Sequence, residues 1–220
     1  MIINRVSSKI YMLLIIFSVL VGILYILLSL YNEKLLKKKT ILLFILIFIM
    51  SVICAKLFSV VITGFKISFK DASLSSYGAL LGVLVSSIIY EMIFPENGKI
   101  IKYSTIALPI MYSFGKIACL FRGCCYGIDY NGILSITYNH LSKPVFPIQL
   151  LEIVVFFLLF IYSNTNKNRK DITYITILFI SIFKYLGEFL RYDFSPFNAN
   201  QTFSIILFII TLFFYKKAKN

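Results

Sequence analysis

Long apolar runs are the feature that most constrains how this chain of 220 residues can fold. A helix that crosses a bilayer needs about 20 predominantly apolar residues, and seven runs of about that length follow one another with short polar segments between them. Because the bilayer interior offers no water to backbone polar groups, each run is expected to be a helix. Since 60% of all residues are hydrophobic, little chain remains for a soluble domain.

The sequence therefore predicts an all-α, polytopic membrane protein that forms a single transmembrane domain over residues 1–220. The expected transmembrane helices cover residues 10–30, 41–63, 77–94, 100–121, 148–162, 172–190 and 201–215. An outer loop at 122–147 is rich in turn residues, with a short extended piece expected at 133–138. Gly78 and Gly82, one helical turn apart, predict close contact between the third helix and a neighbour.

The first run follows two basic residues, Arg5 and Lys9, as the apolar part of a signal peptide does. It is too long for a signal peptide and lacks a small-residue cleavage site, so we interpret it as the first transmembrane helix.

The net charge of +13 does not indicate nucleic-acid binding, because the basic residues lie between apolar runs. Lys and Arg concentrate on the cytoplasmic side of membrane proteins. With the N-terminus outside, the inner segments carry 12 of these residues and the outer segments carry 7. This count predicts an external N-terminus and a cytoplasmic C-terminus.

Charged residues inside the apolar runs are the first indication of a functional site. In the predicted topology Lys56, Lys116 and Lys184 all lie in the outer half of the membrane, at the depth of Glu152 and Glu188. Charges at this depth are costly when they face lipid, so we expect them to converge on one polar cavity. An excess of positive charge below the outer headgroups suits an anionic phospholipid head. The alternative is that each lysine extends to the interface and has no other role.

Three cysteines, Cys119, Cys124 and Cys125, crowd the end of the fourth run. They fit a disulfide in an oxidising compartment, a reactive thiolate, a zinc site completed by His140, or simple packing of a helix end. The spacing lacks the paired ligands of structural zinc sites, so neither a metal nor a cofactor is predicted.

The segment from Gly115 to Gly127 has Lys116, Cys119 and Arg122 at fixed spacing. Four further short elements stand before and after it, in order: Ala55, Lys56 and Leu57; Pro147, Gln149 and Glu152; Phe183, Lys184, Glu188, Phe189 and Arg191; and Gln201 with Ser204. Together they resemble the bacterial prolipoprotein diacylglyceryl transferases, seven-helix membrane enzymes with an external N-terminus. The resemblance runs from residue 11 to residue 204.

Several positions depart from the family pattern. Lysines at 56, 116 and 184 replace arginines, which keeps the charge but loses the planar fork that grips phosphate with two hydrogen bonds. Cys119 and Arg122 stand where the family has asparagine, and Cys124 stands where it has glutamate. The family's histidine before the third helix, thought to act as base, is Tyr77 here. The resemblance is thus to a divergent member.

The resemblance implies transfer of the diacylglyceryl group of phosphatidylglycerol to the lipobox cysteine thiol of a lipoprotein precursor, with release of glycerol 1-phosphate. The partners would be this lipid, the precursor peptide and the bilayer. The protein would be a multi-pass protein of a bacterial plasma membrane, with its active site toward the outer leaflet. The implied catalytic residues are Tyr77, Lys116, Lys184 and Glu188. The implied substrate-binding residues are Lys56, Cys119, Arg122, Gln149, Glu152 and Arg191.

Two points stay open at the level of sequence. The base that activates the thiol can be Tyr77, Glu152, Glu188 or His140. The protein can also be a related transferase that uses another acceptor, or a lipid-binding membrane protein without catalysis.

Overall fold

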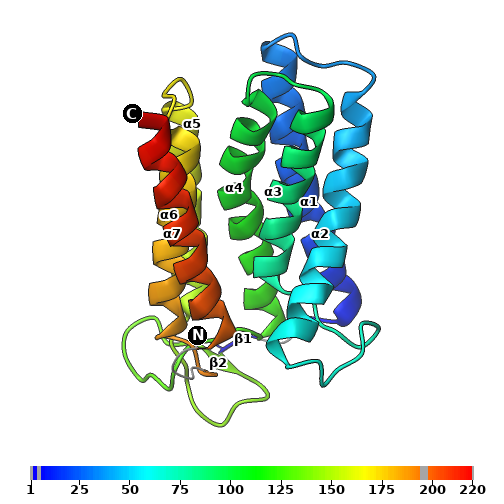
Figure 1. The fold of residues 1–220 in the computed structure, drawn as a ribbon. Coiled ribbons are helices and arrows are strands. Elements are labelled where there is room, and N and C mark those ends of the chain that lie inside the picture. Colours follow the sequence, from blue (N-terminus) through cyan, green and yellow to red (C-terminus); the bar gives the residue numbers. More distant parts are fainter. Residues whose placement is uncertain (1, 4–5, 194–197, 220) are drawn as a thin grey trace. The chain divides into compact units, whose positions relative to one another are not determined.

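The computed structural model describes residues 2–3, 6–193 and 198–219, and these are almost entirely helical (Figure 1). In chain order the elements are β1 (Ile2–Ile3), α1 (Ser8–Asn32), α2 (Thr40–Ile62), α3 (Ser76–Ile93), α4 (Lys99–Arg122), β2 (Thr137–Tyr138), α5 (Ile148–Thr165), α6 (Ile172–Glu188) and α7 (Ala199–Lys219). All seven helices expected from the apolar runs are confirmed, with ends that differ by a few residues.

Six of these helices are long and apolar enough to cross a membrane, among the described residues. The helix outside this set is α6, which has 17 residues and also carries Lys184 and Glu188. Seven spans, the orientation of the termini and a single transmembrane domain therefore stay predictions. Arg5, which enters the orientation count, lies outside the described residues.

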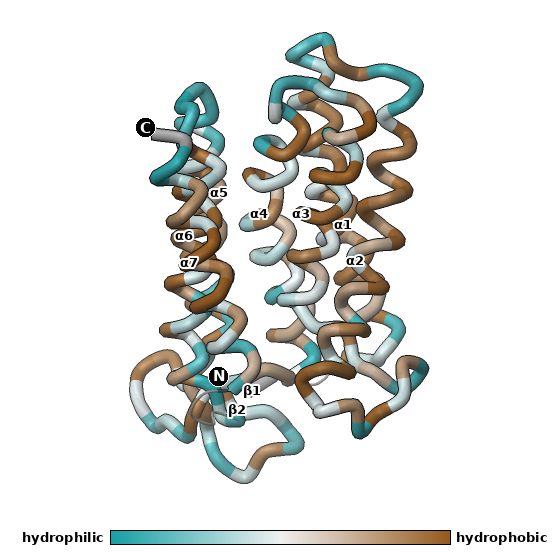
Figure 2. Tube along the Cα trace, in the orientation of Figure 1, coloured by the Kyte–Doolittle hydropathy of each residue, from teal (hydrophilic) through white to brown (hydrophobic). Residues whose placement is uncertain are grey.

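Hydropathy follows the helices closely (Figure 2). Hydrophobic residues dominate the helices, and hydrophilic ones gather at the helix ends and in the connecting loops. The helix α4 is paler than α2, which means that it is the more polar of the two. A polar helix at membrane depth needs protein partners for its polar groups, and α4 carries the residues of the candidate site.

The chain forms two compact units, one of residues 21–108 and one of residues 1–20 with 109–220. In the first unit α2 and α3 pack with their backbones almost touching. A Cβ atom added to Gly78 would clash with the carbonyl oxygen of Cys54, and one added to Gly82 would clash with that of Met50. The close helix contact expected from these glycines is confirmed.

In the other unit the loop after α4 packs against the end of that helix in a small apolar core. Its members are Leu120, Ile136, Tyr138 and Val145. Strand β2 lies in this loop and pairs in parallel with β1, Ile2 opposite Thr137 and Ile3 opposite Tyr138. The expected extended piece at 133–138 is thus confirmed only in its last two residues, and an N-terminal strand as its partner was not expected.

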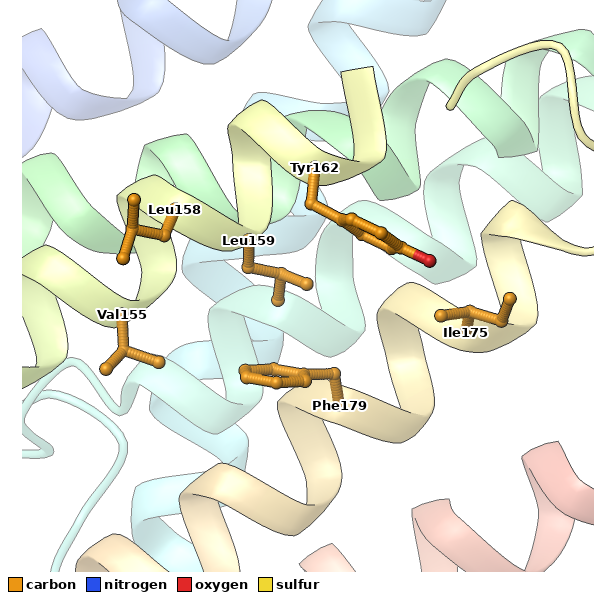
Figure 3. A pocket seen from close by; sticks show the side chains of 6 residues that line it. All are labelled: Val155, Leu158, Leu159, Tyr162, Ile175 and Phe179. Carbon is orange, nitrogen blue, oxygen red and sulfur yellow. The ribbon is translucent and has the colours of Figure 1, made fainter. Parts of the chain in front are cut away.

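The same unit has an apolar pocket of about 460 Å³ on α5 and α6 (Figure 3). Its lining is Val155, Leu158, Leu159 and Tyr162 of α5 with Ile175 and Phe179 of α6. The pocket has no charged side chain in its lining, unlike the site described next.

Candidate functional site

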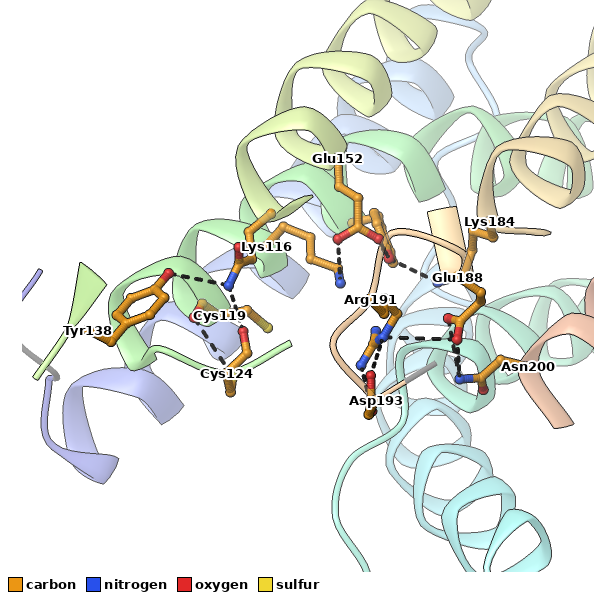
Figure 4. A network of polar contacts seen from close by, with 12 residues as sticks. Lys116, Cys119, Cys124, Tyr138, Glu152, Lys184, Glu188, Arg191, Asp193 and Asn200 are labelled. Carbon is orange, nitrogen blue, oxygen red and sulfur yellow. Dashed lines mark hydrogen bonds and ion pairs between the residues drawn. The ribbon is translucent and has the colours of Figure 1, made fainter. Parts of the chain in front are cut away.

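The centre of the candidate site is a buried ion pair between α4 and α5. The Nζ atom of Lys116 lies 2.6 Å from Oε2 of Glu152, and the side chains point toward one another in Figure 4. Both residues are more than nine-tenths buried. A buried charge is tolerated only when it is paired, so each residue explains the presence of the other.

Tyr112 extends this pair to a third helix. Its hydroxyl donates to Oε1 of Glu152 at 2.7 Å and accepts from Nζ of Lys184 at 2.9 Å. Both ammonium groups also lie against the Tyr112 ring, with Nζ of Lys184 at 4.2 Å and Nζ of Lys116 at 5.2 Å from its centroid. The ring face attracts cations, so one tyrosine holds two lysines of different helices together.

A second polar group lies at the end of α6. Glu188 is buried and accepts hydrogen bonds from the amides of Asn198 at 3.2 Å and Asn200 at 3.3 Å. Its Oε2 lies 3.9 Å from Nε of Arg191, which also donates to Asp193 at 3.0 Å (Figure 4). The carboxylate is therefore held in place by two amide donors and a longer ion pair, all from the chain that follows α6.

Lys116 and Lys184, the two lysines of this unit that lie within apolar runs, do not extend to the interface. Lys116 is 3% exposed and Lys184 is 5% exposed, and both ammonium groups are engaged within the protein. Simple extension to the interface is therefore wrong for these two residues. Lys56, in the unit of residues 21–108, donates instead to the backbone carbonyls of Phe69 and Lys70 at 3.1 and 3.0 Å. Its expected substrate-binding role stays a prediction.

The three cysteines of the signature segment meet at one point. The Sγ atoms of Cys119, Cys124 and Cys125 all lie within 4.8 Å of one another, and all three residues are half-buried and free. Hydrogen bonds from Cys119 and Cys124 lower the pKa of the Cys125 thiol well below its usual range, and the positive charges of Lys116 and Arg191 add to this effect. His140 is exposed and is not a member of this group.

Gln149 connects the thiols to the outer loop. Its Nε2 donates to the carbonyl of Cys124 at 2.8 Å and to the hydroxyl of Tyr138 at 3.3 Å, and the side chain is fully buried. Burial raises the pKa of Tyr138 to about 12, so its hydroxyl keeps its proton. Gln149 therefore fixes the backbone at Cys124, and its expected substrate-binding role stays a prediction.

Gly127, the last residue of the signature segment, closes the loop against the chain after α6. Its N–H donates to the carbonyl of Phe146 at 2.9 Å. An added Cβ would lie 2.6 Å from that oxygen and 2.7 Å from the carbonyl oxygen of Leu190. No larger residue fits there, which explains why a glycine stands at this position.

Arg122 and Tyr77 were both expected at the substrate. The Arg122 guanidinium donates to the carbonyl of Val6 at 2.7 Å and to the hydroxyl of Ser8 at 3.0 Å, so it holds the start of α1. Tyr77 belongs to the other unit, where it is buried and stacks on Phe58 with ring centroids 5.7 Å apart. Their roles toward substrate stay predictions.

Sequence reasoning missed Tyr112, Tyr138, Asn198 and Asn200. Only Tyr112 carried a usable signal, since it precedes Lys116 by four residues and so lies on the same face of α4. Tyr138 lies in β2, Asn198 directly precedes α7 and Asn200 lies in its first turn, and sequence spacing does not indicate which residues of α5 and α6 they will meet.

The charged residues of the buried network, Lys116, Glu152 and Lys184, lie on the three signature elements at 115–127, 147–152 and 183–191. A sequence model of the prolipoprotein diacylglyceryl transferases matches residues 1–216. The chain belongs to this family. Its match to the diacylglyceryl transferases covers nearly the whole chain, as the resemblance of the short motifs implied.

Individual diacylglyceryl transferases are similar at low identity. The phosphatidylglycerol–prolipoprotein diacylglyceryl transferase 2 of Clostridium perfringens is 25% identical over 154 residues, which is 60% of this chain and 59% of that protein. The corresponding protein of Clostridium tetani is 23% identical over 155 residues, 63% of this chain and 61% of its own. That of Dehalococcoides mccartyi is 28% identical over 120 residues, 50% of this chain and 45% of its own. The matches span at most about three fifths of these relatives.

Proposed function

We propose that this protein transfers the diacylglyceryl group of phosphatidylglycerol to the lipobox cysteine thiol of a lipoprotein precursor, releasing glycerol 1-phosphate. The observation that carries the proposal is the buried network of Lys116, Glu152, Tyr112 and Lys184. It unites the residues of three separate family motifs in one place. Membership of the family and the printed names of the relatives support the same reaction.

The reaction requires stabilisation of a departing phosphate. The sulfur of the acceptor forms a bond to the terminal glycerol carbon of the diacylglyceryl group, and the bond from that carbon to the phosphate oxygen breaks. Negative charge grows on the leaving phosphate, and fixed cations in a site of low dielectric constant stabilise it strongly. Lys116, Lys184 and Arg191 are the cations that we assign to this task.

The thiol must also lose its proton to a base. Two buried carboxylates are candidates for this base. Glu152 belongs to the network and accepts a hydrogen bond from Tyr112, and Glu188 belongs to the second polar group and accepts one from Asn198. We therefore place the base at one of these two residues. Glu152→Gln and Glu188→Gln distinguish them, because only loss of the base removes turnover while lipid binding persists.

Complementation is the decisive test. A bacterial host depleted of its own transferase should regain growth and lipoprotein lipidation when it expresses this chain. Lys116→Ala should abolish the rescue. Lys143→Ala is the matched control, since Lys143 forms only an exposed ion pair with Asp129 at 3.3 Å, and it should leave the rescue intact. Absence of rescue despite good membrane expression would contradict the proposal.

Labelled phosphatidylglycerol then distinguishes the remaining alternatives. Turnover that needs a lipobox peptide supports the proposed acceptor, whereas turnover without any peptide indicates a different one. Lipid binding that Lys116→Ala weakens, with no turnover under any condition, would indicate a lipid-binding protein instead.

A further inference from the structure

The thiols of Cys119, Cys124 and Cys125 are brought together by the backbone. Cys119 lies in the last turn of α4, and the N–H of Cys124 donates back to its carbonyl at 3.2 Å. Gly123 and Cys125 both have left-handed φ angles, +67° and +58°. A non-glycine residue rarely adopts this conformation. The chain thus reverses tightly around Cys124, and this reversal brings thiols five and six residues apart in sequence to one point.

The spacing of the sulfur atoms suits a small metal ion. Zinc–sulfur bonds of about 2.3 Å in a tetrahedral site place the sulfurs about 3.8 Å apart. The Sγ atoms here lie within 4.8 Å of one another. They need to approach by at most about 1 Å to meet that geometry. Three thiols also exceed what one disulfide can use, because a disulfide joins two sulfurs and leaves the third.

The surroundings favour a cluster that carries negative charge. Three thiolates around one monovalent or divalent cation leave a net charge of −2 or −1. Two cations lie nearby in the fold: Lys116 stands one turn before Cys119 in α4, and Arg191 pairs through its backbone with Gly127, two residues after Cys125. The Nε2 atom of Gln149 donates to the carbonyl of Cys124 at 2.8 Å. Such outer hydrogen bonds orient the ligands of metal sites.

The donor set selects the type of metal. Among the residues that the structure describes, the group of candidate ligands consists of the three cysteines alone. Thiolate is a soft ligand that prefers Cu⁺ and Zn²⁺, whereas Mg²⁺ and Ca²⁺ prefer oxygen. Three thiolates suffice for Cu⁺, and Zn²⁺ would take a fourth ligand from solvent.

We propose that Cys119, Cys124 and Cys125 form a binding site for one thiophilic d¹⁰ cation, Cu⁺ or Zn²⁺, held by three thiolates. The site does not depend on the transfer reaction, and its test measures metal rather than lipid.

The test uses the full chain in detergent micelles, reduced and stripped of metal. It is titrated with Zn²⁺ or with Cu⁺ in competition with a chromophoric chelator of each ion. One equivalent of at least one ion should bind tightly, and the arm that binds identifies the metal. Replacing any one of the three cysteines by serine should weaken binding at least tenfold, the lower end of what even an outer-shell change costs. Cys54→Ser is the matched control and should leave the affinity unchanged.

A second measurement needs no variant. Alkylation of the wild-type chain, read by mass spectrometry, should modify all four cysteines without metal and only Cys54 once one equivalent is bound. The proposal is overturned when neither ion binds at one equivalent. It is equally overturned when bound metal leaves the three signature thiols reactive, or when Cys54→Ser weakens binding as much as Cys125→Ser does.

Discussion

The buried pair of Lys116 and Glu152 makes a sharp prediction at the scale of single residues. Replacing only Lys116 by methionine leaves a buried carboxylate without its cation, which costs about 3–5 kcal/mol. The double change Lys116→Met with Glu152→Leu removes both charges and should recover most of that loss. Thermal unfolding in detergent measures the difference. Lys143→Met, at an exposed pair, should change stability by less than about 0.5 kcal/mol.

Equal destabilisation by the single and the double change would show that Lys116 and Glu152 are not paired in the protein. Both K116M and the double variant should lose transferase activity, because the cation is needed in either case.

Tyr112 carries the second prediction at this scale. Tyr112→Phe keeps the ring but removes the hydroxyl that donates to Glu152 and accepts from Lys184. A buried polar group that loses its hydrogen-bond partner lowers the free energy of unfolding by about 1–3 kcal/mol. The unfolding temperature should therefore fall, and lipidation should decrease. Tyr126→Phe is the control, since its ring lies in the outer loop. Unchanged stability and activity in Tyr112→Phe would show that the hydroxyl of this tyrosine has no role in the site.

The convergence of Lys116, Lys184 and Glu152 was predictable because isolated charges at membrane depth are costly and must find partners. The tyrosine that joins them was not, because tyrosine is common in membrane helices and nothing in its type indicates burial between two lysines. Whether Lys56 belongs with them stays a prediction, since its ammonium is engaged by loop carbonyls of its own unit.

At the scale of elements, the contact of α2 and α3 depends on two glycines. Gly78→Ala or Gly82→Ala inserts a methyl group against a neighbouring backbone, which cannot move aside as a side chain can. Overpacking of this kind costs about 1–3 kcal/mol. Gly187→Ala is the matched control in α6, where an added Cβ meets nothing within 4 Å, and it should be neutral or stabilise by up to about 1 kcal/mol. Equal effects at all three positions, read from the yield of monodisperse protein after heating, would contradict the close contact.

The helices were predictable from the sequence because apolar length alone decides them, and their observed ends differ from the expected ones by a few residues. The pairing of β1 with β2 was not predictable. Each strand has only two residues, and the partners stand more than 130 positions apart in the chain. No local pattern reports such a contact.

At the scale of the whole molecule, the seven-span topology with an external N-terminus can be tested by labelling. Single cysteines are introduced into a chain whose native cysteines are changed to serine. Asn131→Cys, in the outer loop, should react with a membrane-impermeant thiol reagent on intact cells. Lys38→Cys and Lys170→Cys should react only after the membrane is opened. All three positions are exposed, so burial does not confuse the result.

Reaction of both Asn131→Cys and Lys170→Cys on intact cells would show that α5 does not span the membrane. It would then place the loop between α5 and α6 outside the cell, against the charge count.

The pairing of Lys116 with Glu152 also has a consequence for biosynthesis. The two residues stand 36 positions apart, and ribosomes add about 5–20 residues per second. The lysine of α4 therefore leaves the ribosome about 2–7 s before its counter-ion exists. A lysine in a lone helix costs up to about 2.5–3.5 kcal/mol at the translocon, the value at the helix centre. We expect α4 to remain at the translocon until α5 has been synthesised, so that the two helices insert into the lipid together.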